Sequence, residues 1–287
     1  MSIAYLNGQY LPLSDAKVSP MDRGFLFADG VYEVVPVYQG KPFGLEKHLE
    51  RLERSLSAIK LASGLSQTAW IEAITEIIRR NGGGHQLVYL QVTRGVAEVR
   101  DHRFPDIVVP TIFIMSSAVD APKKEGPLSA VGISAVTIPD IRWGRCDIKS
   151  VALLPNILGR QQAIEKHADE AIFIREDLVT ECPAANVFIV KQNEVVTPPL
   201  NETILGGVTR DIVISLLEKN HILCRQRPVM KMELFTADEI WISSSSKDLL
   251  PVTMLDGNPV GEGVPGALWR RAAEMYQQYK HNLFGIA

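Results

Sequence analysis

Apolar and polar residues alternate in short stretches along most of the chain, and this pattern predicts many short β-strands joined by tight turns. Residues 4–13 and 30–44 each contain two such stretches around a central pair of turn residues, which is typical of a β-hairpin. Further strands are expected over residues 86–95, 106–117, 131–138 and 239–246. Turns between paired strands are predicted at Asn7-Gly8, Gln39-Gly40, Glu176-Asp177, Gln192-Asn193 and Asp256-Gly257.

A different spacing predicts helices. Apolar residues at Leu45, Leu49, Leu52, Leu56 and Ile59 are separated by four or three positions, so they share one face of a helix. A second helix is expected from about Ser66, which can cap its start, to Arg80, before a run of glycines. Two more helices are expected over residues 155–168 and 209–220.

This mixture of helices and hairpins predicts an α/β fold of α+β character that is rich in antiparallel sheet. With 287 residues the chain is long enough for two domains. Residues 121–127, APKKEGP, have the composition of a linker. We therefore expect a smaller N-terminal domain over residues 1–120 and a larger C-terminal domain over residues 128–287.

The composition excludes several classes of function. The net charge is −3 and the basic residues are scattered, so the sequence shows no electrostatic footprint for nucleic acid. No apolar run approaches the ~20 residues of a membrane helix. The three cysteines form no metal-binding spacing, and the first residues look like a strand rather than a signal peptide. These features predict reduced thiols and a cytoplasmic protein without a metal site or membrane partner.

Lys149 lies in an unusual setting for a lysine, because apolar residues of the stretch RCDIKSVALLPN surround it. Burial would disfavour the ammonium and lower the lysine pKa. A neutral amine is a nucleophile that forms an imine with a carbonyl group. The alternative interpretation is a structural lysine whose charged end extends to the surface.

Three other features could bind an anionic or cationic ligand. Glu181 ends a predicted strand, where a buried carboxylate would need a cationic or hydrogen-bonding partner. The glycines of ILGGVTRD precede a predicted helix, whose free amides could bind phosphate. The hydroxyl groups of residues 243–246 could add donors. Each feature alone is equally compatible with a structural role in a strand end, helix start or polar turn.

Basic side chains could bind the anionic groups of a ligand. Arg51 lies beside the apolar face of the first helix and could reach a phosphate. Arg100 and His102 follow a predicted strand, and alternate positions of an extended chain point the same way. The pair could therefore hold a carboxylate, although most such residues are simply solvated.

Together, and in this order, these stretches resemble one enzyme family. DRGFLFADGVYEVV, HLERL, VTRG followed by Arg-x-His, RCDIKSVALLPN, VTECPAANVF, GGVTRD and SSSSKDLLPV are similar to the pyridoxal-phosphate enzymes of fold type IV. Among these enzymes the stretches most resemble the D-amino-acid aminotransferases. The resemblance runs from about Asn7 to Val260 and implies a two-domain fold type IV enzyme.

The resemblance also implies a role for individual residues. Lys149 would form the Schiff base with pyridoxal phosphate and move a proton between the substrate and the cofactor. Glu181 would face the pyridine nitrogen, and Leu205 would pack on the ring. The implied contacts of the phosphate are Arg51, Val208, Thr209 and Ser245. Tyr32, Arg100 and His102 would hold the substrate carboxylate, with the Arg–His pair supplied by the other subunit of a homodimer.

The implied reaction exchanges an amino group between a D-amino acid, with D-alanine expected, and a 2-oxo acid, with 2-oxoglutarate expected. Two alternatives share the fold: a branched-chain L-amino-acid aminotransferase and an aminodeoxychorismate lyase, neither of which is expected to need the Arg-x-His pair. A third alternative is a binding protein without catalysis or cofactor. The sequence departs from the family at Pro183, Ala184 and Ala185, where serines are usual.

Overall fold

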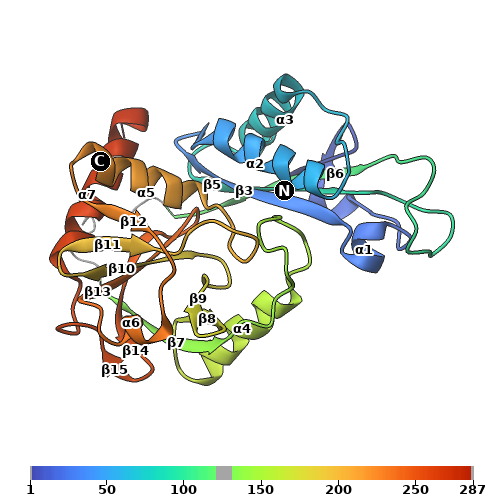
Figure 1. The fold of residues 1–287 in the computed structure, drawn as a ribbon. Helices are drawn as coiled ribbons and strands as arrows, with labels where there is room; N and C mark the ends of the chain where they lie inside the picture. Colours follow the sequence, from blue (N-terminus) through green and yellow to red (C-terminus); the bar gives the residue numbers. More distant parts are fainter. Residues whose placement is uncertain (1, 121–130, 286–287) are drawn as a thin grey trace. The chain divides into compact units, whose positions relative to one another are not determined.

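The structure is a computed structural model that describes residues 2–120 and 131–285 (Figure 1). The chain divides into two compact units. Unit 1 comprises Met1–Ala121 with Ile148–Ala152, and unit 2 comprises Pro122–Asp147 with Leu153–Ala287. The expected linker at residues 121–127 lies outside the described residues. Ile148–Ala152 packs with unit 1, although in the sequence it follows the expected boundary.

Unit 1 contains a six-stranded antiparallel sheet in the order β2-β1-β6-β5-β3-β4. Its strands are β1 (Ile3–Leu6), β2 (Gln9–Pro12), β3 (Gly30–Tyr38), β4 (Lys41–Pro42), β5 (Gln86–Thr93) and β6 (Thr111–Ala118). The predicted turns at Asn7-Gly8 and Gln39-Gly40 are confirmed, and all four residues have positive φ. The strand predicted over 106–117 begins only at Thr111, because Pro110 has no backbone N–H for the ladder.

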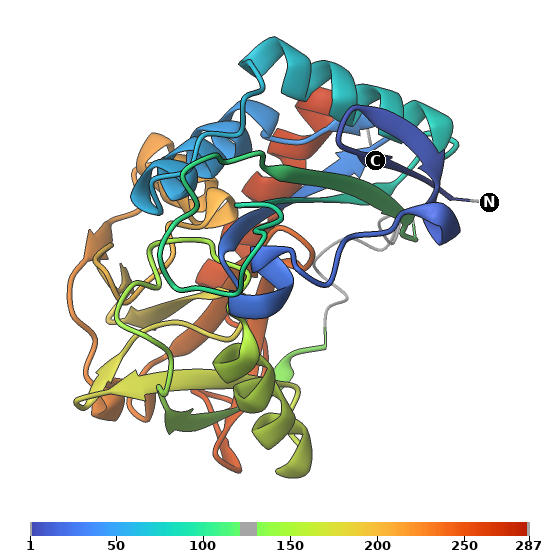
Figure 2. The same cartoon turned by 90° about the vertical axis from the view of Figure 1, so that its right-hand side faces the viewer.

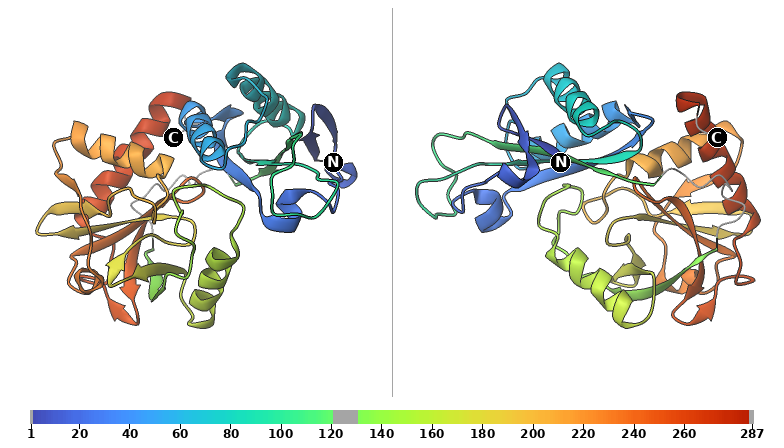
Figure 3. Two further views of the ribbon diagram at one scale, coloured as in Figure 1. Left: turned by 45° about the vertical axis from the view of Figure 1, so that its right-hand side comes forward. Right: turned by 180° about the vertical axis from the view of Figure 1, so that it is seen from behind.

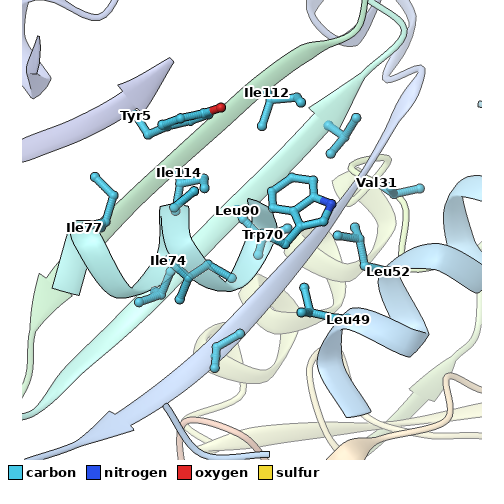
Figure 4. Close-up of a cluster of buried hydrophobic side chains, with 14 of the residues drawn as sticks. Tyr5, Val31, Leu49, Leu52, Trp70, Ile74, Ile77, Leu90, Ile112 and Ile114 are labelled. Atoms are coloured by element: carbon cyan, nitrogen blue, oxygen red, sulfur yellow. The ribbon is translucent and has the colours of Figure 1, made fainter. Parts of the chain in front are cut away.

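The helices of unit 1 are α1 (Arg23–Phe27), α2 (Leu45–Ala58) and α3 (Gln67–Arg80), and a 3₁₀ turn covers Leu13–Asp15. The predicted Ser66 cap is confirmed, because its hydroxyl accepts a bond from the Ala69 N–H. The predicted face of α2 packs in the core, with Leu49, Leu52 and Leu56 buried and the end residues Leu45 and Ile59 partly buried. Figure 4 shows how α2 and α3 form one core with the sheet. Leu52 of α2 and Trp70 of α3 lie there among residues such as Leu90 of β5.

Unit 2 contains a nine-stranded mixed sheet, in the order β12-β11-β10-β13-β14-β7-β8-β9 with β15 paired to β14. The strands are β7 (Ile133–Pro139), β8 (Glu170–Arg175), β9 (Leu178–Val179), β10 (Asn186–Lys191), β11 (Glu194–Thr197), β12 (Cys224–Gln226), β13 (Glu239–Ser244), β14 (Asp248–Leu255) and β15 (Asn258–Pro259). The three hairpin turns predicted in this half are confirmed. The mixed α/β fold class is confirmed as well.

The helices of unit 2 are α4 (Leu154–Glu165), α5 (Val208–Lys219), α6 (Lys231–Leu234) and α7 (Ala267–Phe284). Helices α5 and α7 lie together in both views of Figure 3 and pack on β13, whereas α4 packs on β7 and β8. The sequence interpretation contains α4 and α5 but not α7. Within the described part of the chain, no helix is both long and apolar enough to cross a membrane.

Candidate active site

Lys149 lies beside the start of β3 in unit 1. The Tyr32 N–H donates to the Lys149 carbonyl at 3.0 Å, and the Lys149 N–H donates to Ser55 Oγ at 3.2 Å. Ser150 forms an antiparallel bridge with Val31. These bonds fix the lysine backbone against the sheet and α2. The Lys149 Nζ lies 4.0 Å from the centroid of the Tyr32 ring, so the structure brings these two predicted site residues together.

Arg51 belongs to a buried ion pair in the same unit. Its Nε and Nη2 donate to the two carboxylate oxygens of Glu33 at 2.6 and 2.8 Å. His48 Nδ1 lies 2.7 Å from Glu33 Oε2, and because a carboxylate only accepts, this nitrogen donates. Glu33 lies on the same face of β3 as the buried Val31 and Val35, so it points toward α2, where His48 and Arg51 lie about one turn apart.

The ion pair fixes the charge of each group. Burial raises the pKa of Glu33, but Arg51 and His48 outweigh burial and hold that pKa well below its usual range. Burial also lowers the pKa of His48, which favours the neutral imidazole. The site therefore combines an ionised glutamate, a charged arginine and a neutral histidine.

Glu181 forms a second buried ion pair, in unit 2. Arg142 Nη1 donates to Glu181 Oε1, and Arg142 also donates to both oxygens of Asp140 at 2.9 Å. The side chains of Arg142 and Asp140 are 4% and 0% exposed. Burial lowers the pKa of Arg142, but the two carboxylates raise it above its usual range. Arg142 thus supplies the positive charge that a buried glutamate requires.

Glu181 is also joined to the loop that precedes α5. Its Oε2 accepts from the Leu205 N–H and from Asn186 Nδ2, both at 3.2 Å, and Asn186 Nδ2 donates to the Leu205 carbonyl at 2.9 Å. A Cβ on Gly207 would come within 2.1 Å of Asn186 Oδ1, so a larger residue there would displace the Asn186 side chain. Asn186 therefore ties the glutamate, Leu205 and the start of α5 into one cluster.

The predicted phosphate contacts of unit 2 lie around this cluster. Val208 and Thr209 are the first residues of α5. The N-cap residue is Gly207, which has no side chain to accept a hydrogen bond from the amides of the first turn. A helix start of this kind favours an anion. Ser245 lies in the turn between β13 and β14, and Ser243 just before it pairs with Asn186. The turn is consequently at the end of the sheet where β10 begins.

Arg100 and His102 lie in the exposed loop between β5 and β6 of unit 1. Both side chains contact Phe27 of α1. The Arg100 guanidinium lies 4.9 Å from the centroid of the phenyl ring, and the His102 and Phe27 ring centroids are 5.3 Å apart. The structure thus brings Arg100 and His102 together on one aromatic side chain.

Comparison with known proteins identifies the family. The model of the family "Amino-transferase class IV" matches residues 30–255. A D-alanine aminotransferase of Bacillus licheniformis is 39% identical over 275 residues, which are 94% of this chain and 94% of that protein. The chain is a class IV aminotransferase. A D-alanine aminotransferase of Staphylococcus haemolyticus is 38% identical over 97% of this chain and 98% of its own length.

A solved structure agrees with the fold of this class IV aminotransferase. The branched-chain amino acid aminotransferase of Escherichia coli superimposes with a TM-score of 0.87 and 23% identity. The match covers 100% of this chain and 95% of that protein. The fold type IV prediction is therefore confirmed.

Several residues of this aminotransferase that support the site are missing from the sequence interpretation. They are Glu33, Arg142 and Asn186, which pair with Arg51 or Glu181, and His48, which pairs with Glu33. One signal was available for Glu33, because a charged residue occupies a position that the strand pattern assigns to the core. No local sequence pattern marks the other three residues as partners, and Arg142 lies 39 positions from Glu181.

Proposed function

We propose that this class IV aminotransferase is a pyridoxal-phosphate-dependent D-amino-acid aminotransferase. Its reaction would exchange the amino group between D-alanine and 2-oxoglutarate and give pyruvate and D-glutamate. The observation that carries the proposal is the identity of 38–39% to two D-alanine aminotransferases over nearly the whole chain. The branched-chain enzyme shares the fold at only 23% identity.

The residues fit a cofactor with an aldehyde, a pyridine nitrogen and a phosphate. Lys149 offers an amine, and Glu181 offers a carboxyl group that Arg142 holds by a hydrogen bond. For a phosphate, unit 1 offers the guanidinium of Arg51, and unit 2 offers the free amides at the start of α5 and the hydroxyls of Thr209 and Ser245. When bound, pyridoxal phosphate supplies an electron sink for the carbanion formed at the substrate Cα.

Lys149 would act through its Nζ. The amine would hold the cofactor through its aldehyde and would move a proton to and from the substrate Cα. Its backbone is fixed by Tyr32 and Ser55, so the amine works from a defined position. Glu181, held in place by Arg142, would face the pyridine nitrogen and accept a hydrogen bond from its protonated form.

Arg100 and His102, with Tyr32, would hold the substrate α-carboxylate and so decide which Cα bond reacts. We propose that the Arg–His pair serves the neighbouring subunit, which makes the enzyme a homodimer. The three free thiols, at Cys146, Cys182 and Cys224, suit a cytoplasmic enzyme.

A comparison of substrates tests the proposal. Purified enzyme loaded with pyridoxal phosphate is given D-alanine or L-leucine, each with 2-oxoglutarate, and the glutamate formed is resolved by handedness. We expect D-glutamate and pyruvate from D-alanine and little product from L-leucine. Turnover of L-leucine without turnover of D-alanine would contradict the proposal and favour the branched-chain alternative. Pyruvate released from aminodeoxychorismate would favour the lyase.

A further inference from the structure

A buried arginine of α1 holds the backbone of the loop that carries Arg100 and His102. The Arg23 guanidinium donates to the carbonyls of three successive residues: Asp101 at 2.6 Å, His102 at 3.3 Å and Arg103 at 3.3 Å. The Arg23 side chain is 4% exposed, whereas residues 98–104 are all exposed. The loop is therefore fixed from its inner side by one side chain.

Arg23 is itself anchored by a shared carboxylate. Its Nε donates to Asp29 Oδ2 at 2.8 Å, and Arg94 donates to both oxygens of Asp29 at 2.8 and 3.1 Å. Burial raises the pKa of Asp29, but hydrogen bonds from Arg94 and Arg23 outweigh it and keep the carboxylate ionised. The Arg94 guanidinium lies 3.7 Å from the centroid of the Phe104 ring, so the far end of the loop rests on the same assembly.

Helix α1 is tied to the sheet by its N-cap. Asp22 accepts from the Gly24 N–H at 2.8 Å and from the hydroxyls of Thr93 and Thr111 at 2.7 and 2.6 Å. These threonines end β5 and begin β6. Figures 1 and 2 show α1 beside the loop that joins these strands. Phe27 of α1 then supports both the Arg100 and the His102 side chains.

We propose that Arg23 is a positioning residue for substrate recognition, which acts through Arg100 and His102. By fixing the carbonyls of residues 101–103, it presents the two side chains in one arrangement before the substrate binds. A preorganised pair loses less conformational entropy on binding, which strengthens the contact with a carboxylate. This inference rests on the proposed function, because that proposal makes the pair a carboxylate site.

The test compares substrates that carry a carboxylate with an amine that lacks one. Arg23→Gln should raise the KM for D-alanine and 2-oxoglutarate by about tenfold to 100-fold, as expected for a misplaced binding group. The kcat should change less, and the absorption spectrum of the bound cofactor should stay the same. The slow single-turnover reaction with isopropylamine should keep its rate, because this amine has no carboxylate.

Two further variants keep the proposal falsifiable. Arg79→Gln is the matched control, because Arg79 pairs with Glu76 on the exposed face of α3, and its KM should not change. Arg23→Lys keeps the positive charge but cannot reach three carbonyls and Asp29 together. Its KM should lie between those of the unaltered enzyme and Arg23→Gln, and it provides the measurement if Arg23→Gln does not fold.

A double-mutant cycle separates positioning from a structural role. In a protein that already carries Arg100→Gln and His102→Gln, adding Arg23→Gln should raise the KM no further, because its targets are gone. A full additional rise, or an equal loss of rate with isopropylamine, would overturn the proposal. Failure of the proposed function would look different, since the unaltered enzyme would then not turn over D-alanine at all.

Discussion

The buried ion pairs that contain Arg51 and Glu181 are built in opposite ways. In unit 1 the central group is a carboxylate: Glu33 receives bonds from both Arg51 and His48, and its side chain is 0% exposed. In unit 2 the central group is a cation, because Arg142 donates to both Asp140 and Glu181. Arg51 and Glu181 have the proposed cofactor contacts. Neither is the central group of its cluster, and we call them the outer residues.

The comparison shows two ways in which a fold can fix a buried charged side chain that is to contact a ligand. An isolated buried charge is costly, so each outer residue needs a fixed partner of opposite sign. The central residue balances the charge and sets the direction of the outer side chain. Glu33 thus supports Arg51 in unit 1 and Arg142 supports Glu181 in unit 2, although neither has a proposed contact with the cofactor.

Arg142→Met should have the largest effect, because it removes the cation shared by two buried carboxylates. Loss of one partner of a buried ion pair costs about 3–5 kcal/mol of unfolding free energy. Affinity for pyridoxal phosphate should fall as well, because the charge and direction of Glu181 change. Urea unfolding of the cofactor-free protein and a titration with pyridoxal phosphate measure the two effects.

Arg145→Met is the control for this change. Arg145 lies three positions away and pairs with Asp147 at the surface, where the side chains are 44% and 35% exposed. Its loss should leave the unfolding free energy nearly unchanged. If the two variants proved equally stable, the central role of Arg142 would be wrong.

Glu33→Gln should destabilise unit 1, because it leaves the buried cation Arg51 without its negatively charged partner. We expect a loss of about 3 kcal/mol in urea unfolding. The double variant Glu33→Gln with Arg51→Met removes both charges and should recover most of the stability. It should still bind pyridoxal phosphate weakly, because the proposed phosphate contact is gone. Tight binding by the double variant would remove Arg51 from the site.

Acid should weaken the protein partly through Glu33, and this effect is the smallest of the three. The pKa of Glu33 lies below its usual value of 4.5, so protons bind the unfolded chain more readily than the folded one. The stabilisation is complete above pH 4.5 and is lost as the pH falls below it, by at most about 1.4 kcal/mol per pH unit. Urea unfolding at a series of pH values should give a shallower slope for Glu33→Gln. An identical slope in both proteins would mean that Glu33 does not contribute.

Local patterns of sequence predicted the elements well. The turns at Asn7-Gly8 and Asp256-Gly257 were predictable because Asn-Gly and Asp-Gly pairs readily adopt the positive φ angles of a tight hairpin turn, as all four residues do here. The stripe of α2 was predictable because its spacing alone defines a face. Helix α1 was not predicted, since five residues are too short to show a period.

The contacts of the site depend on positions far apart in the chain. Glu33 and Arg51 are 18 positions apart, and Arg142 and Glu181 are 39 apart. No spacing rule links such residues, so only the folded structure shows that they pair. For the same reason the sequence did not indicate that Ile148–Ala152, and with it Lys149, packs with unit 1.

The most direct test of the proposed function identifies the lysine that carries the cofactor. The enzyme is loaded with pyridoxal phosphate, reduced with borohydride to make the bond permanent, digested and mapped by mass spectrometry. We predict the pyridoxyl label on Lys149. Label on a different lysine, with Lys149 unmodified, would contradict the account.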